Sequence, residues 1–256
     1  MAAQPGRDAA GTKQEAGPAP PGREVTHVAG PDGARSVLWV LLALTFVSGV
    51  VDAVCYLGMG RVFTANMTGN IVVLGFAAAG APGFSVTASL TSLAVFLVGA
   101  VVGGRLTVHV TRRSRTLSAA IAVEAIFVAA AATVASTAAT VAAGWGRFTT
   151  IALLAFAMGI RNAVIRRLSI PDMTTTVLTM TLTGLAADSA LAGGTNPRFL
   201  RRAASVLAML VGAVMGAALY LHKGPGLPLV IAAVAAALAA VAAEASSSIH
   251  GYLDRK

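Results

Sequence analysis

The chain of 256 residues is 56% hydrophobic and only 11% charged, a composition that does not fit the surface of an ordinary soluble domain. A mean hydropathy of +0.78 points to lipid as the main solvent, which disfavours a soluble enzyme, a nucleic-acid-binding protein and a secreted disulfide scaffold. The formal charge of +9 does not indicate a nucleic-acid partner, because the basic residues lie mainly in short connections between apolar runs. Cys55 is the one cysteine, so no intramolecular disulfide can form.

The first 36 residues are polar and rich in alanine, glycine and proline, and we expect them to form a disordered cytoplasmic tail. The remainder is typical of an all-α, polytopic helical membrane protein. Its apolar segments are 37–59, 66–81, 87–108, 118–143, 148–165, 173–192, 203–222 and 227–245. Two of them are weaker, because 66–81 is short and opens with polar residues and 173–192 is crowded with threonines.

The distribution of arginine and lysine decides whether the two weak segments span the membrane. If all eight segments cross, the basic residues of the connections divide seven to seven between the two sides. If the weak segments are re-entrant or broken and the N-terminus is cytoplasmic, eleven lie inside and only Arg61, Arg147 and Lys223 lie outside. Because the second arrangement follows the positive-inside rule, we predict six full spans plus two partial ones, with both termini cytoplasmic.

An internal repeat relates residues 37–143 to residues 148–245, leaving 246–256 as a short cytoplasmic C-terminal tail. Three blocks align with a shift of 110 to 113 residues, and they pair Gly49–Val54 with Gly159–Val164, Met67-Thr68 with Leu178-Thr179, and Leu97–Gly103 with Leu210–Gly216. With three full spans per unit, the second unit enters the membrane from the opposite side, which predicts an inverted-topology repeat. Asp52 and the aligned Asn162 would then lie at different depths, whereas eight spans would place them level.

Asp52 is the most informative polar residue, because it lies some fifteen residues into an apolar helix. A carboxylate at that depth costs about 2.5–3.5 kcal/mol unless it is paired, protonated or hydrated. One interpretation is a proton or cation site. The other is a structural hydrogen bond, either as an internal helix cap or to the polar run that follows.

That polar run contains Asn66, Thr68 and Asn70 and precedes an apolar half-helix. Short amide and hydroxyl side chains satisfy the polar groups of non-helical backbone at membrane depth. The beginning of a half-helix favours an anionic group through its dipole, while neighbouring carbonyls could hold a cation. A purely structural helix break is the alternative.

The second half offers a corresponding but less regular set of candidates. Arg161 is expected to extend to the cytoplasmic surface, and Glu124 to lie near the membrane interface. Threonines can also bond back to helix carbonyls, which is their structural interpretation. The candidates beyond Asp52 and the first polar run are Asn162, Thr175, Thr176, and, as further residues, Arg161, Thr179 and Glu124.

No enzymatic or metal-binding pattern is recognisable in the sequence. The four histidines are scattered without supporting cysteines or carboxylates, and neither a nucleophile–base pair, a P-loop nor a dinucleotide fingerprint is present. We therefore expect no metal, no cofactor and no enzyme. Gly99 with Gly103, and Gly212 with Gly216, predict close helix packing. The expected partners are the lipid bilayer and an unidentified small solute or ion, without nucleic acid; a homo-oligomer is left open.

Several of these residues together resemble the YoaK-like family of small bacterial integral-membrane proteins, a domain of unknown function. The resemblance covers about residues 38–245 and rests on Gly49, Asp52-Ala53, Tyr56-Leu57, Phe63, the run Ala65-Asn66-Met67-Thr68-Gly69-Asn70, Asn162 and Thr175-Thr176. The second half departs from the pattern at Thr179-Met180, where a Thr-Gly step is expected. The resemblance implies the bacterial inner membrane and no established substrate.

The leading hypothesis is a small secondary transporter or permease, coupled to a proton or cation at Asp52. The repeat, the buried carboxylate and the broken helices motivate it. The alternative is a non-transporting membrane scaffold or regulatory protein, in which the polar motifs only lock the two halves together.

Overall fold

A computed structural model describes residues 31–110, 112–137, 144–168, 178–196 and 198–254. Six helices in these ranges are long and apolar enough to cross a membrane. They are α1 (Pro31–Gly58), α3 (Val86–His109), α4 (Arg113–Ser136), α6 (Trp145–Arg167), α8 (Phe199–Lys223) and α9 (Gly226–Ala245). The described residues contain no strand, so the predicted all-α polytopic membrane fold is confirmed.

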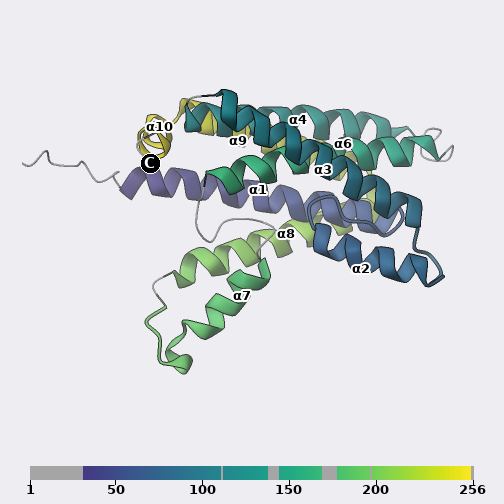
Figure 1. The fold of residues 1–256 in the computed structure, drawn as a ribbon, viewed down its shortest axis with the longest axis horizontal. Coiled ribbons are helices and arrows are strands. Elements are labelled where there is room, and N and C mark those ends of the chain that lie inside the picture. The colour runs from purple at the N-terminus through teal and green to yellow at the C-terminus, as the bar shows by residue number, and fades with distance from the viewer. Residues whose placement is uncertain (1–30, 111, 138–143, 169–177, 197, 255–256) are drawn as a thin grey trace, which may run out of the picture.

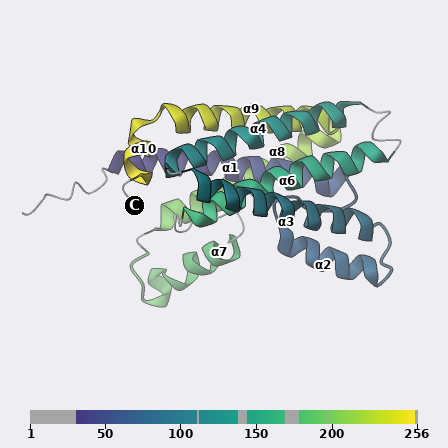
Figure 2. The same ribbon diagram turned by 45° about the horizontal axis from the view of Figure 1, so that its top comes forward.

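Two short helices, α2 (Met67–Ala78) and α7 (Leu178–Ala187), correspond to the two weak segments. With 12 and 10 residues, they extend about 18 and 15 Å, roughly half of a hydrocarbon core about 30 Å thick. From the middle of the bundle, the two short helices run toward opposite ends of it (Figures 1 and 2). A short 3-10 helix, η2 (Ala190–Ala192), follows α7, and α10 (Ser247–Leu253) lies near the C-terminus.

The long helices lie side by side, and their directions sort the basic residues onto two ends of the bundle (Figures 1 and 2). The end at which α1 begins is called the arginine-rich end. Its described arginines are Arg35, Arg105, Arg112, Arg113, Arg115, Arg166, Arg167, Arg198, Arg201 and Arg202. The opposite end carries Arg61, Arg147 and Lys223.

Glycines bring α1 against α8 and α3 against α6 at backbone contact. A Cβ atom on Gly212 would overlap the Phe46 carbonyl oxygen, and one on Gly99 would overlap the Phe156 carbonyl oxygen. These two contacts are equivalent, because each glycine and each phenylalanine aligns with its counterpart in the repeat. The close packing predicted from the paired glycines is therefore confirmed.

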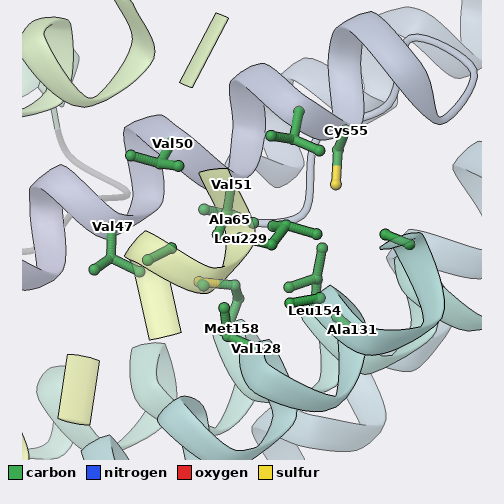
Figure 3. Packing of buried hydrophobic residues seen from close by; sticks show 14 of the residues in the cluster. Val47, Val50, Val51, Cys55, Ala65, Val128, Ala131, Leu154, Met158 and Leu229 are labelled. Atoms are coloured by element: carbon green, nitrogen blue, oxygen red, sulfur yellow. The ribbon is translucent and has the colours of Figure 1, made fainter. Parts of the chain in front are cut away.

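The apolar core lies between α1, α4, α6 and α9 (Figure 3). Branched and sulfur-containing side chains of these helices fill it, among them Val47, Val50, Val51, Cys55, Val128, Leu154, Met158 and Leu229. In contrast, α8 exposes large apolar side chains such as Leu210 and Val214. In a bilayer these side chains contact lipid.

The two ends of the described chain differ from the expected tails. α1 already includes Pro31, six residues before the apolar segment that predicts it. Near the other end, residues expected to form a tail make α10, whose beginning is capped by the Ser246 hydroxyl. The Asp254 carboxylate accepts hydrogen bonds from the backbone N–H and hydroxyl of Ser114, at 3.0 and 2.9 Å. It thereby caps the beginning of α4, whose own N-cap residue makes no side-chain cap.

The environment of Asp254 changes the pKa of its carboxyl group. Desolvation raises this pKa, but the two hydrogen bonds from Ser114 and the positive charges of His250 and Arg112 outweigh it and hold the pKa below its usual value. The ionised carboxylate is thus the form that binds α10 to α4.

Candidate functional site

Asp52 lies less than two turns before the end of α1 and is 4% exposed. Its Oδ1 atom accepts hydrogen bonds from the backbone N–H groups of Thr64 and Ala65, each at 2.8 Å. These N–H groups belong to the non-helical segment between α1 and α2. The structural interpretation of Asp52 therefore applies to one carboxylate oxygen, which holds this segment in place.

The other oxygen, Oδ2, is buried without a hydrogen-bond partner among the described residues. Asp52 also lines a cavity of about 330 Å³, whose other lining residues are Ala65, Asn66, Thr68, Gly69, Val72, Leu178, Thr179 and Met209. A buried polar atom without a partner is costly and rare in folded proteins. The Asp52 carboxylate thus combines a structural hydrogen-bond acceptor with an unsatisfied one at a cavity.

Both short helices contribute residues to this cavity. Thr68 and Gly69 belong to the first turn of α2, while Leu178 and Thr179 are the first residues of α7. Met67-Thr68 and Leu178-Thr179 are also aligned in the internal repeat. The positive end of the α2 dipole therefore lies at the cavity.

Two residues of the first polar run line the cavity, and the third holds the segment between α1 and α2. Asn66 and Thr68 line the cavity, and Asn66 is the N-cap of α2, accepting from the Gly69 N–H at 3.3 Å. Asn70 is buried and does not line it. Its side chain instead accepts from the Phe63 N–H at 2.8 Å and donates to the Phe63 carbonyl at 2.6 Å. Asn70 thus positions the connecting segment.

Sequence reasoning missed Ser92 and Met209. The Ser92 hydroxyl donates to the Phe63 carbonyl at 2.6 Å and lies 3.1 Å from Asn70 Nδ2. Ser92 thus joins α3 to the segment that connects α1 and α2. Ser92 could have been identified from the sequence, because it is a small polar residue in the apolar segment 87–108. Met209 lines the cavity from α8, but an apolar residue in an apolar helix carries no signal of this kind.

The expectation that Arg161 extends to the surface is wrong, because its side chain is fully buried. Its Nη1 atom donates to Glu124 Oε1 at 2.7 Å and to the Leu44 carbonyl at 3.2 Å, and Nη2 donates to the Ser48 hydroxyl at 2.6 Å. Glu124 is also fully buried and is the twelfth residue of the 24-residue helix α4, so its expected place near the interface is wrong as well. These residues join α1, α4 and α6 and do not line the cavity.

The second-half candidates are only partly brought to the cavity. Thr179 lines it, whereas Asn162 is half-buried on α6 and is not among the lining residues. Thr175 and Thr176 lie outside the described residues. Within the described ranges, no group of three or more histidine, cysteine, aspartate or glutamate residues could hold a metal ion.

Comparison with known proteins places the chain in a family. A family model described as "Protein of unknown function (DUF1275)" matches residues 40–242. The chain is 37% identical over 159 residues to the UPF0700 transmembrane protein YoaK of Bacillus subtilis (strain 168), covering 60% of this chain and 67% of that protein. No solved structure matches. The matched region contains α2, α3, α4, α6, α7 and α8 entirely. The chain therefore belongs to the DUF1275 family and is similar to the transmembrane protein YoaK.

Proposed function

We propose that this protein is a small secondary transporter or permease whose substrate site is the cavity at Asp52. One observation carries the proposal: Asp52, whose Oδ2 atom is buried without a partner among the described residues, lines a cavity together with residues of the two short helices α2 and α7. Half-helices that begin at a central cavity are the arrangement by which many secondary transporters bind their substrates.

The competing function is a non-transporting scaffold or regulatory protein. Its support comes from the Asn70 and Arg161 networks, which join neighbouring elements and leave the cavity aside. A scaffold, however, gains nothing from an unsatisfied buried carboxylate oxygen, which lowers stability. The Oδ2 atom of Asp52 therefore favours a site that a ligand or proton occupies.

An inverted-topology repeat would supply the two states that alternating access needs. Its support is that α1 and the aligned α6 run in opposite directions in the bundle (Figures 1 and 2). In addition, Arg161, the neighbour of Asn162, bonds to Leu44 and Ser48 of α1. Leu44 and Ser48 precede Asp52 by eight and four residues, so Arg161 contacts α1 about 6–12 Å along the helix from Asp52.

We place the arginine-rich end in the cytoplasm, with the chain in the bacterial inner membrane, on the basis of the positive-inside rule. Pro82 in the connection after α2 and Thr195 after α7 are exposed positions of equivalent connections. In cells carrying Pro82→Cys or Thr195→Cys, a membrane-impermeant thiol reagent should label only the first. Labelling of both from the outside would contradict the inverted repeat.

Transport itself is tested by the current or uptake that purified protein produces in proteoliposomes offered small anions, small cations and neutral solutes. Met209→Trp should abolish any flux, because the indole would occupy a cavity of about 330 Å³. Leu210→Trp is the matched control, since Leu210 is 56% exposed on the next position of α8. A folded wild-type protein without flux of any solute class, or equal flux in both variants, would favour the scaffold.

A further inference from the structure

We propose that Arg161 is a positioning residue that makes the carboxyl groups of Asp52 and Glu124 share one proton. The inference deepens the proposed function, on which it rests for the role of that proton in coupling, but its test needs no flux. In the part of the chain that the structure describes, the buried charged side chains are Asp52, Glu124 and Arg161. Two acids and one base therefore lie inside the apolar bundle.

The charges of these three side chains call for one bound proton. If all three were ionised, two negative charges and one positive charge would leave a net charge of −1 in the bundle. A buried charge without a counter-charge is costly, and a buried acid takes up a proton instead. One proton makes the set neutral, because the guanidinium balances whichever carboxylate stays ionised. A second proton would leave the guanidinium without a counter-charge.

Arg161 is bonded to one of the two acids and contacts the helix of the other. Its Nη1 atom donates to Glu124 Oε1 at 2.7 Å, and its Nη2 atom donates to the Ser48 hydroxyl at 2.6 Å. Ser48 lies four residues before Asp52, on the same face of α1 and about 6 Å along the helix. Arg161 also acts on Asp52 electrostatically. A change of charge on either carboxylate is therefore felt by the same guanidinium.

Each carboxylate has one oxygen left for a proton. Asp52 Oδ1 accepts from the backbone N–H groups of Thr64 and Ala65, and Glu124 Oε1 accepts from Arg161. The second oxygens, Asp52 Oδ2 and Glu124 Oε2, are both buried without a hydrogen-bond partner among the described residues. The shared proton forms its O–H bond at one of these two oxygens.

The ion pair shows which acid holds the proton in this structure. Glu124 is bonded to the guanidinium at 2.7 Å, so Glu124 is ionised and the proton is on Asp52. When the O–H bond of Asp52 breaks and the proton passes to water, the three side chains gain a negative charge. Neutrality returns when Glu124 Oε2 takes one proton from water and Arg161 balances Asp52. Proton release at one acid is thereby coupled to proton uptake at the other.

Other titratable groups on the surrounding elements do not replace this balance. Cysteine and tyrosine side chains are neutral near pH 7, and the charged residues among these groups are exposed. α2 contains no titratable residue. The nearest ones along the other elements are Cys55 and Tyr56 on α1, Arg61 in the segment after α1, Arg105 on α3, Arg115 on α4, Arg166 on α6, Tyr220 on α8 and Glu244 on α9.

The test is infrared spectroscopy of the full-length protein in liposomes at neutral pH, which detects the C=O stretching band of a protonated carboxyl group. The wild type should show one such group. Asp52→Asn should remove the band, because ionised Glu124 balances Arg161. Glu124→Gln should remove it too, although Asp52 is unchanged, because Asp52 must then ionise to balance the guanidinium. The glutamine amide still accepts the hydrogen bond from Arg161, which an alanine would lose.

Variants of Arg161 repeat the test without changing either acid. Arg161→Met should double the band, because both acids then take up a proton, whereas Arg161→Lys keeps the positive charge and should keep one protonated group. Glu244→Gln is the control, since it removes an exposed carboxylate of α9 and should leave the band unchanged. Thermal unfolding of each variant identifies a folding defect.

A band of wild-type strength in Glu124→Gln would overturn the inference, because Asp52 would then hold its proton independently. An unchanged band in Arg161→Met would overturn it as well. One shared proton in a protein that carries no solute in proteoliposomes would support this inference and contradict the transporter. Flux together with two independent acids would do the reverse.

Discussion

Arg161 and Glu124 form an ion pair that is fully buried in the helix bundle. Desolvating two charges is expensive, and here their mutual attraction is supported by hydrogen bonds from Arg161 to Leu44 and Ser48. Because the four residues come from α1, α4 and α6, the pair holds three helices in one register. This arrangement explains why the arginine does not extend to the membrane surface.

Removing one member of this pair should therefore destabilise the protein strongly. Glu124→Ala leaves a buried guanidinium without its counter-charge, with an expected loss of about 3–5 kcal/mol in the free energy of unfolding. The double variant Glu124→Leu with Arg161→Met removes both charges and should recover most of that loss. Thermal unfolding in detergent measures both effects. A single variant as stable as the wild type would show that the pair does not hold the helices together.

At the residue scale, the sequence showed which polar residues lie in apolar segments, but it did not show which residues they contact. Asp52 and the polar run stood out because polar residues are rare in apolar segments. The pairing of Arg161 with Glu124, 37 positions away, depends on how α4 and α6 face each other. Hydropathy alone does not separate a side that faces lipid from a side that faces another helix.

At the element scale, glycines determine which helices touch. The backbone of α3 meets that of α6 at Gly99 and Gly103, and the equivalent pair on α8 meets α1. The sequence predicted close packing from these spacings, and helix lengths followed from the apolar runs. It did not predict α10, because seven residues of mixed polarity show too weak a hydrophobic periodicity to indicate a helix. This short helix is stabilised by its packing on α1 and α4.

Two adjacent glycines of α3 provide a test of this packing. A Cβ on Gly103 would lie 2.8 Å from the Ile160 Cα atom, whereas one on Gly104 would meet no atom within 4 Å. Gly103→Ala should therefore cost about 1–3 kcal/mol through overpacking. Gly104→Ala should be neutral or slightly stabilising, since alanine favours the helix. Equal unfolding temperatures for the two variants would contradict the packing described here.

The contact between α10 and α4 should depend on pH through Asp254. Since its pKa is lower in the folded state than in the unfolded chain, its stabilising effect is complete above the ordinary pKa of about 4 and is lost as the pH falls through the folded value. Hydrogen exchange of α10 should therefore accelerate below about pH 4. Asp254→Asn should show faster exchange at neutral pH already, and an unchanged rate in that variant would exclude this cap.

At the scale of the whole molecule, the candidate site exists only where the two halves meet. α1 and α2 bring Asp52 and Thr68, while α7 and α8 bring Thr179 and Met209. The repeat and the distribution of basic residues allowed six full spans and two partial ones to be predicted. The cavity was beyond that reasoning, because its walls come from segments more than 100 residues apart, and the closeness of α2 and α7 depends on the packing of every helix between them.

The most direct test of this account is the water accessibility of the cavity-lining residues of the two short helices. Thr68→Cys and Thr179→Cys are equivalent cavity positions, and Ile71→Cys and Met180→Cys are controls on the same helices that are 61% and 64% exposed outside the cavity. Since thiol reagents attack the thiolate, which forms in water, a polar reagent applied to the protein in liposomes should modify both cavity cysteines and neither control. Cavity cysteines that stay unmodified, or react no faster than the controls, would contradict a shared substrate cavity.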